Sequence, residues 1–280
     1  MEVLKLITDG SKILEKRNIA SHKLDSEILL SKVLKKDRNR LLLNLNQLAQ
    51  EEDIRNFNAL IRRRSKREPI AYILREKEFW SKNFYVCKDA LIPRPETELL
   101  VENIIKKFEN KNISILDVGT GSGCILLSIL SELKNSRGIG IDISQKAIKV
   151  AKKNQIRQNL LSRSKFLLRS IDKIYGYKFD LIVSNPPYIT QKDYNNLEDD
   201  IKKFEPKIAL DGGNDGLDVI KKVIYKSKSI LKIKGMLALE IGYGQFKKVS
   251  KILKEENFKT KFLVRDYREN IRCILSTLQK

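Results

Sequence analysis

The sequence predicts an α/β fold with a mostly parallel sheet, preceded by a small helical-bundle domain. Three observations support this prediction. Short apolar runs alternate with amphipathic stretches from residue 113 onward, and such alternation is typical of a parallel sheet with helices on both faces. Residues 1–67 show helical spacing of apolar side chains without a strand pattern. Aromatic and β-branched residues gather in between, over 68–92, which indicates β-structure.

The helical domain is expected over residues 1–67. Its clearest helix has apolar residues at helical spacing over 24–34, behind Ser21 as a candidate N-cap. Another periodic stretch ends in the run Arg62-Arg63-Arg64, which is typical of a solvated helix end. A small helical bundle is therefore the simplest interpretation of this part of the chain.

A β-hairpin linker is expected over residues 68–92, because a segment starting at Pro69 mixes aromatic residues with charged turns. The run Pro93-Arg94-Pro95 then interrupts the chain. A helix is expected to open at Glu96, since acidic residues are favourable in a first helical turn. The α/β domain accordingly spans 93–280.

The remaining elements follow from the alternation of apolar runs and amphipathic stretches. The closely spaced last two apolar runs indicate an antiparallel pair. Strands are expected over 113–118, 138–143, 166–168, 179–184, 236–241, 258–264 and 271–276, and helices over 122–133, 144–158, 216–231 and 245–255.

The composition excludes several classes of protein. No stretch approaches the about 18 apolar residues of a membrane span, and the N-terminus has no signal-peptide pattern. The three cysteines form no Cys-x-x-Cys pair and His22 is the sole histidine. The sequence therefore predicts neither a disulfide framework nor a metal site, and it favours a cytoplasmic protein without a membrane partner.

The chain carries 56 Lys+Arg and 35 Asp+Glu, a formal net charge of +21. This excess is spread along the sequence, so it has two interpretations. It can attract nucleic acid or an acidic protein surface, or it can reflect a Lys-, Ile- and Asn-rich composition that base bias in the gene dictates. Charge alone does not decide between them.

A glycine-rich loop follows the strand expected at 113–118. It reads Asp117-Val118-Gly119-Thr120-Gly121-Ser122-Gly123, and glycines there permit a tight turn and close approach of the backbone to a ligand. Asp142 ends the next strand, where a carboxylate can accept both hydroxyl hydrogens of a ribose across the crevice from the loop. Asp117 could bind a ligand's ammonium. The combination suits a nucleoside that carries an amino-acid tail, which describes S-adenosylmethionine better than NAD. The spacing of the loop is Gly-x-Gly-x-Gly, whereas enzymes that bind dinucleotides have Gly-x-Gly-x-x-Gly.

A second loop follows the strand expected at 179–184, with the sequence Asn185-Pro186-Pro187-Tyr188. The prolines stiffen the loop and lack N–H donors, so the Asn185 side-chain oxygen and the Pro186 carbonyl can both accept hydrogens from an –NH₂ group. Tyr188 adds a ring on which a planar group can stack. These groups favour methyl transfer to a planar nitrogen, with no histidine base required.

The chain resembles class I methyltransferases that act on amide or exocyclic nitrogens and, more specifically, the HemK/PrmC family. The resemblance spans nearly the full length, through motifs in the expected order. They are Pro69-Ile70-Ala71-Tyr72-Ile73, Glu78-Phe79, Leu91-Ile92-Pro93-Arg94-Pro95-Glu96-Thr97-Glu98, Glu205-Pro206, Ala209-Leu210, Gly213, Asp215-Gly216-Leu217 and Glu240-Ile241-Gly242.

This resemblance implies a Rossmann-like catalytic domain, with an antiparallel last strand, that methylates a glutamine amide (N5) in translation termination. The substrate would be the Gly-Gly-Gln glutamine of class-1 peptide chain release factors, docked by the helical domain of a monomeric enzyme that needs no nucleic acid. The cofactor would be S-adenosylmethionine, released as S-adenosylhomocysteine, and no metal is implied. Arg75 and the run Leu168-Arg169-Ser170-Ile171 depart from the family pattern.

The resemblance also implies roles for individual residues. Pro187 and Tyr188 would shape the pocket in which Asn185 and the Pro186 carbonyl hold the amide. The cofactor would be held by Asp117, Gly119, Thr120, Gly121, Ser122, Gly123, Asp142 and Asn185, with Arg94, Thr97 and Glu98 on the cofactor side.

Other functions remain open on the sequence alone. A ribosomal-protein glutamine methyltransferase is a near alternative, and DNA or RNA adenine N6-methyltransferases carry a similar loop and flip a base into their pocket. A basic nucleic-acid-binding module without activity would show steeply salt-dependent binding and no methyl transfer.

Overall fold

The structure, a computed structural model, describes residues 1–279. The chain forms two compact units. The first contains Met1–Arg75 and a distant segment, Glu198–Phe204. The second contains Glu76–Leu197 and the rest of the chain from Glu205. The chain therefore passes between the units at three places.

The first unit is a helical bundle. Its helices are α1 (Val3–Glu15), α2 (His22–Val33), α3 (Arg38–Leu42), α4 (Glu51–Ser65), α5 (Ile70–Leu74) and α10 (Asp199–Phe204). The apolar faces of α1, α2 and α4 enclose a core that includes Leu14, Leu29 and Phe57. Ser21 precedes α2, but its side chain makes no capping hydrogen bond, so the N-cap expected there is incomplete.

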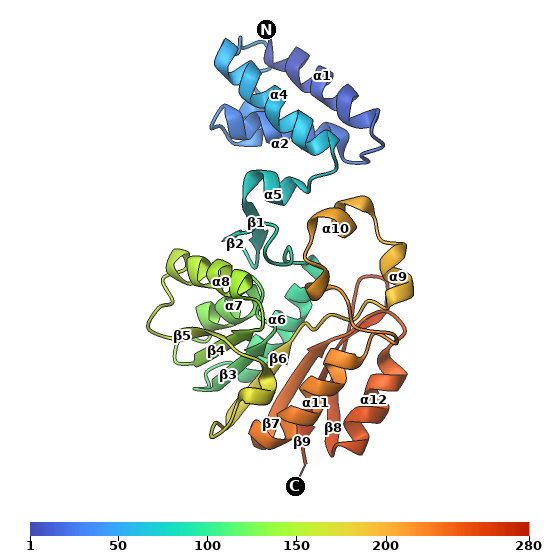
Figure 1. Cartoon of the computed structure of the whole chain (residues 1–280). Coiled ribbons are helices and arrows are strands. Elements are labelled where there is room, and N and C mark those ends of the chain that lie inside the picture. Colours follow the sequence, from blue (N-terminus) through green and yellow to red (C-terminus); the bar gives the residue numbers. More distant parts are fainter. Residues whose placement is uncertain (280) are drawn as a thin grey trace. The chain divides into compact units, whose positions relative to one another are not determined.

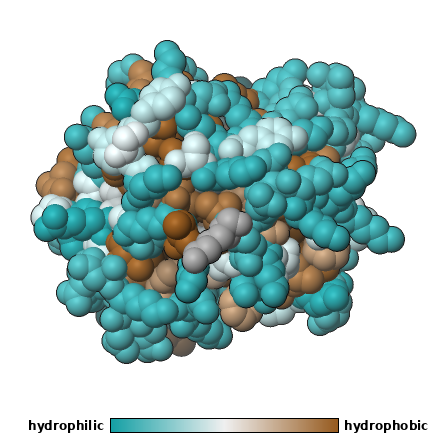
Figure 2. Space-filling view, turned by 90° about the horizontal axis from the view of Figure 1, so that it is seen from below, coloured by the Kyte–Doolittle hydropathy of each residue, from teal (hydrophilic) through white to brown (hydrophobic). Residues whose placement is uncertain are grey.

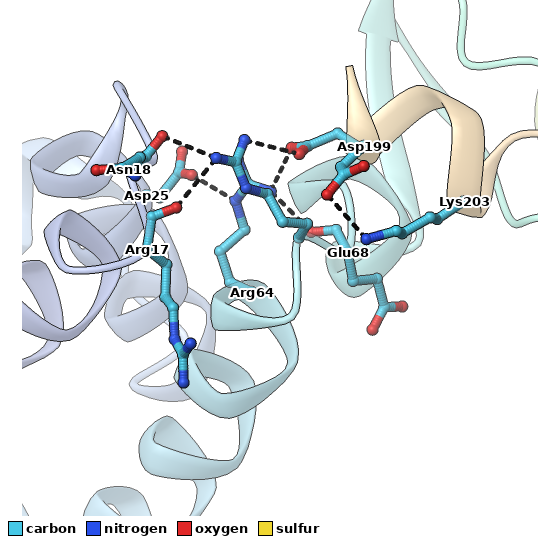
Figure 3. A network of polar contacts seen from close by, with 9 residues as sticks. Arg17, Asn18, Asp25, Arg64, Glu68, Asp199 and Lys203 are labelled. Atoms are coloured by element: carbon cyan, nitrogen blue, oxygen red, sulfur yellow. Dashed lines mark hydrogen bonds and ion pairs between the residues drawn. The ribbon is translucent and has the colours of Figure 1, made fainter. Parts of the chain in front are cut away.

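A buried arginine joins α10 to the rest of this unit (Figure 3). Arg64 of α4 donates to Asp25 of α2 at 2.7 Å and to Asp200 of α10 at 2.7 Å. Arg67 adds a contact of 3.3 Å to Asp200. Burial works to lower the pKa of the Arg64 guanidinium, yet the hydrogen bonds to both carboxylates raise it overall. The expectation that this arginine run is solvated is therefore wrong for Arg64.

The second unit opens with the hairpin β1 (Glu76–Phe79) and β2 (Lys82–Tyr85), whose pairing is antiparallel. The sequence placed the hairpin segment from residue 68, but the residues after Pro69 form the short helix α5. Arg75 adopts a left-handed conformation at the end of that helix (φ 57°). Helix α6 (Pro95–Phe108) begins with Pro95 at its first turn, where the missing N–H costs no hydrogen bond.

A seven-stranded sheet forms the centre of the second unit (Figure 1). Its strand order is β5-β4-β3-β6-β7-β9-β8. Strand β9 is antiparallel to both of its neighbours, and the other pairings are parallel. The strands are β3 (Ser114–Val118), β4 (Arg137–Asp142), β5 (Ser164–Leu168), β6 (Phe179–Ser184), β7 (Leu231–Glu240), β8 (Phe258–Arg265) and β9 (Ile271–Leu278).

Helices cover both faces of the sheet, as the sequence alternation predicts. Successive strand residues point to opposite faces, so Leu181 and Val183 pack in one core whereas Ile182 packs in the other. The first core also contains residues of α6, α7 (Cys124–Glu132) and α8 (Gln145–Arg157), and the second those of α11 (Asp218–Ile230) and α12 (Phe246–Glu255).

The strand order reverses between β3 and β6. Open α/β sheets bind ligands outside the carboxyl ends of the strands at such a switch point. The glycine loop follows β3 and the Asn185 loop follows β6, so the topology brings the two predicted sites to one crevice.

Within residues 1–279, no helix is both long and apolar enough to cross a membrane. Hydrophilic residues also cover most of the face that Figure 2 shows.

Candidate active site

The three glycines of the loop after β3 all adopt left-handed conformations, with φ of 71° at Gly119, 54° at Gly121 and 80° at Gly123. Gly119 and Gly121 line a cavity, and a Cβ on Gly119 would have no heavy atom within 4 Å. A Cβ on Gly123 would instead lie 3.0 Å from the Phe166 ring. The first two glycines therefore leave room for a ligand, whereas the third permits close internal packing.

Asp117 lies beneath this loop and is fully buried. Its Oδ2 accepts a hydrogen bond of 2.6 Å from Thr120, while its Oδ1 has no partner among the described residues. Burial chiefly raises the pKa of Asp117 to about 7; the Thr120 hydrogen bond opposes this shift and the Asp142 charge adds to it. Asp117, Thr120, Ser122 and Gly123 are not among the cavity-lining residues, so direct ligand contacts by them stay predictions.

Asp142 ends β4 and lines the cavity. Its Oδ2 accepts from the Gly121 N–H at 3.0 Å, and its Oδ1 accepts from the Ser144 N–H at 2.8 Å. The sequence interpretation placed this carboxylate across the crevice from the loop, but the structure bonds it to the loop. Each carboxylate oxygen retains a second lone pair for a ligand hydroxyl.

The loop after β6 contributes Asn185 and Pro187 to the cavity wall, but not Pro186 or Tyr188. Asn185 Nδ2 donates to Thr97 Oγ1 at 3.2 Å. The Tyr188 hydroxyl is 3.3 Å from Glu240 Oε1, and its partly buried ring packs against the core under α11 and α12. Stacking of a substrate on Tyr188 therefore stays a prediction.

Residues at the start of α6 have structural partners. Arg94 Nη2 donates to Glu205 Oε1 at 2.6 Å, and the Glu205 carboxylate also accepts from the Ile92 N–H at 3.2 Å. Glu98 accepts from the Trp80 N–H at 2.9 Å. Arg94, Thr97 and Glu98 do not line the cavity, but Glu205 directly precedes a segment that does.

The cavity has a volume of about 490 Å³, within the range of small-molecule sites. Several lining segments received no site role from the sequence, among them Arg169–Ile171 after β5 and Pro206–Ala209 after Glu205. The first could have been found, because it lies at the carboxyl end of the strand beside β4. The second overlaps the motifs Glu205-Pro206 and Ala209-Leu210, but neither motif follows a strand that would place it at the site. Among the described residues, no group of His, Cys, Asp and Glu side chains is arranged to hold a metal ion.

Glu240, like Glu205, is a buried polar residue near this site to which the sequence analysis gave no role. It ends β7 and is 1 % exposed. Its Oε2 accepts a hydrogen bond of 2.6 Å from Thr97. Burial is the main cause that raises the pKa of Glu240, against the Thr97 hydrogen bond and the charge of Arg272.

The seven-stranded sheet with one antiparallel strand, its switch point and the glycine loop define a class I methyltransferase domain. A family model described as a methyltransferase domain matches residues 109–269, and one described as the PrmC N-terminal domain matches residues 5–74. A methyltransferase structure from Pyrococcus furiosus covers 70% of this chain and 89% of its own, with a TM-score of 0.54 at 16% identity, which supports the fold.

Curated relatives extend the similarity to the whole chain. A release factor glutamine methyltransferase of Clostridium botulinum is 41% identical over 273 residues, 96% of each chain. One of Fusobacterium nucleatum is 40% identical over 280 residues, 98% of this chain and 78% of the relative. The chain therefore belongs to the PrmC/HemK family of release factor glutamine methyltransferases.

Proposed function

We propose that this protein transfers a methyl group from S-adenosylmethionine to the side-chain amide nitrogen (N5) of the Gly-Gly-Gln glutamine in class-1 peptide chain release factors. The observation that carries this proposal is the position of Asn185, on the wall of the cavity beside the glycine loop. Its Nδ2 is engaged by Thr97, so its carbonyl oxygen remains as an acceptor for a substrate –NH₂ group.

The cavity fits S-adenosylmethionine by its own chemistry. Gly119 and Gly121 present backbone without side chains to it, and the Asp142 carboxylate suits the two hydroxyls of a ribose. The buried Asp117 carboxyl, whose Oδ1 has no partner among the described residues, would supply a negative charge beneath the loop once a cationic ligand offsets the cost of ionising it. When bound, S-adenosylmethionine supplies an electrophilic methyl group on a sulfonium that leaves as a neutral thioether.

The Asp142→Ala variant should weaken binding of this cofactor first, and unchanged affinity in calorimetry would contradict the ribose assignment.

The protein's own groups address the weak nucleophilicity of an amide, whose nitrogen lone pair is delocalised into its carbonyl. The Asn185 oxygen and the Pro186 carbonyl would accept the two N–H bonds and orient the lone pair toward the methyl group. Their dipoles would stabilise the positive charge that develops on nitrogen. The methylated nitrogen would then release one N–H proton to solvent water, which leaves the neutral N-methyl amide. Alignment of the two reacting groups would supply much of the remaining acceleration.

Intact-mass spectrometry of a class-1 release factor tests this proposal. The factor is incubated with the protein and S-adenosylmethionine, beside the same factor with Ala in place of the Gly-Gly-Gln glutamine. One added methyl group on the first factor and none on the second is the expected result. No methyl group on either, with cofactor binding intact, would refute the proposal and redirect the search to ribosomal proteins and nucleic acids.

A further inference from the structure

The orientation of the Asn185 side-chain amide is a question that the proposed function depends on. Its oxygen and nitrogen ends have nearly the same shape, yet only the oxygen can accept a substrate N–H. If the amide were turned over, its –NH₂ would face the –NH₂ of a glutamine. Some feature of the surrounding protein must therefore select one orientation.

Two side chains, one from β7 and one from α6, form a hydrogen-bonded chain that leads to Asn185. Glu240 at the end of β7 accepts from Thr97 Oγ1 at 2.6 Å, and Thr97 in the first turn of α6 accepts from Asn185 Nδ2 at 3.2 Å. Thr97 is 2 % exposed and Glu240 is 1 % exposed. Water therefore has little access to this chain, and its donors and acceptors must match one another.

The direction of the chain follows from the chemistry of a carboxylate. An ionised carboxylate only accepts hydrogen bonds, and 2.6 Å is the length expected of a hydroxyl donating to a charged oxygen. The Tyr188 hydroxyl lies 3.3 Å from the other oxygen of Glu240. Burial raises the pKa of Glu240 overall, whereas the hydrogen bonds from Thr97 and Tyr188 and the charge of Arg272 favour its charged form.

We infer that Glu240 and Thr97 are positioning residues that fix which end of the Asn185 amide faces the cavity. The Thr97 hydrogen is committed to Glu240, so the Thr97 oxygen can only accept. It therefore selects the Asn185 –NH₂ end and leaves the Asn185 carbonyl oxygen for the substrate. This inference rests on the proposed function, and it adds a determinant of selectivity for a carboxamide over a carboxylate.

Two variants, one in α6 and one in β7, test the hydrogen-bonded chain independently of each other. Thr97→Val keeps the shape but removes the partner of Asn185. Glu240→Gln can donate to Thr97, which allows the whole chain to reverse and to present the Asn185 –NH₂ to the cavity. Each variant should lower kcat roughly 10–100-fold, as expected when a buried partner is removed, with the dissociation constant for S-adenosylmethionine unchanged.

Three matched measurements separate positioning from a general structural effect. Thr97→Ser keeps the hydroxyl and should retain kcat. Ser184→Ala removes a neighbouring buried hydroxyl that donates to the Val118 carbonyl at 2.7 Å, outside the chain, and should also retain kcat. A release factor with Glu in place of the Gly-Gly-Gln glutamine, used as a competitor, should gain roughly tenfold in relative affinity for Glu240→Gln. Wild-type kcat in Thr97→Val and Glu240→Gln, together with wild-type discrimination against the Glu-containing competitor in Glu240→Gln, would overturn the inference.

A readout without substrate keeps this test separate from the proposed function. The side-chain ¹H–¹⁵N signals of Asn185, assigned by their loss in Asn185→Ala, should show slow hydrogen exchange in the wild-type protein and fast exchange in Thr97→Val. Unchanged exchange in Thr97→Val would overturn the inference even if the wild-type protein methylates a release factor. Failure of the wild-type protein to methylate would refute the proposed function alone, because the exchange measurement still decides the positioning role.

Discussion

Asp117 is fully buried, and its Oδ1 has no hydrogen-bond partner among residues 1–279. Such a group is costly to ionise in the ligand-free protein, which is why burial raises its pKa from 3.8 to about 7. A cation bound above the loop would offset that cost. The residue is thus suited to coupling the charge of a ligand to the stability of the site.

This pKa predicts a pH dependence of stability. A carboxyl whose pKa is higher in the folded than in the unfolded state adds stability at low pH, and this contribution is lost as pH rises from about 4 to about 7. The full shift corresponds to about 4 kcal/mol. Urea unfolding of the ligand-free protein at pH 5 and pH 8 should show a larger loss of stability in the wild type than in Asp117→Asn. Equal losses in the two proteins would contradict the prediction.

Sequence analysis predicted individual site residues only where a local sequence pattern marks them. The glycine loop, Asp142 and Asn185 follow strand ends, so their meeting at one edge was predictable. Thr97 and Glu240 are 143 residues apart and meet through tertiary packing, which no local pattern records. Arg64 resembled its exposed neighbour Arg62 in the sequence, and only folding distinguishes the two.

The glycine loop is an element whose three glycines have two different functions. Gly121→Ala adds a Cβ toward the cavity at a φ of 54°, so its stability cost should be about 1–2 kcal/mol while its affinity for S-adenosylmethionine falls. Gly123→Ala combines a φ of 80° with a contact to Phe166, so it should cost about 2–4 kcal/mol. Urea unfolding and calorimetry check the contrast. A larger stability loss in Gly121→Ala would contradict it.

The sheet and its helices were predictable because their apolar residues repeat with the period of each structure. The strand expected at 179–184 matches β6, and the last two strands pair antiparallel as expected. The short helices α3, α5 and α9 (Gln191–Asn195) were missed, since five residues are too few to show a helical period. Aromatic and β-branched residues near Pro69 favoured a strand, but Tyr72 and Ile73 pack as part of a helix.

At the scale of the whole molecule, α10 belongs to the helical unit although its sequence neighbours belong to the catalytic one. Asp200 accepts a hydrogen bond from Arg64 within the helical unit. Glu205, which directly follows α10, accepts one from Arg94 within the other unit. The segment between the Asn185 loop and the cavity-lining residues 206–209 is therefore anchored in both units. Sequence reasoning could not find this, because the six residues of α10 are too few to show a helical period.

Arg64→Met should destabilise the protein by about 3–5 kcal/mol, because it leaves the buried Asp25 carboxylate without its cation. Arg62→Met on the same helix is the matched control, since Arg62 is exposed, and should change stability by less than about 0.5 kcal/mol. Urea unfolding of both variants checks the difference. Equal stabilities would show that the Arg64 contacts contribute no net stabilisation.

The central claim is that Asn185, at the switch point of the sheet, holds the substrate amide for methyl transfer. The most direct test measures S-adenosylmethionine affinity and methylation of a class-1 release factor for Asn185→Ala beside the wild type. Affinity should stay within about threefold, while kcat falls roughly 10²–10³-fold, the loss typical of removing one group that stabilises developing charge. Turnover close to the wild-type rate would contradict the claim.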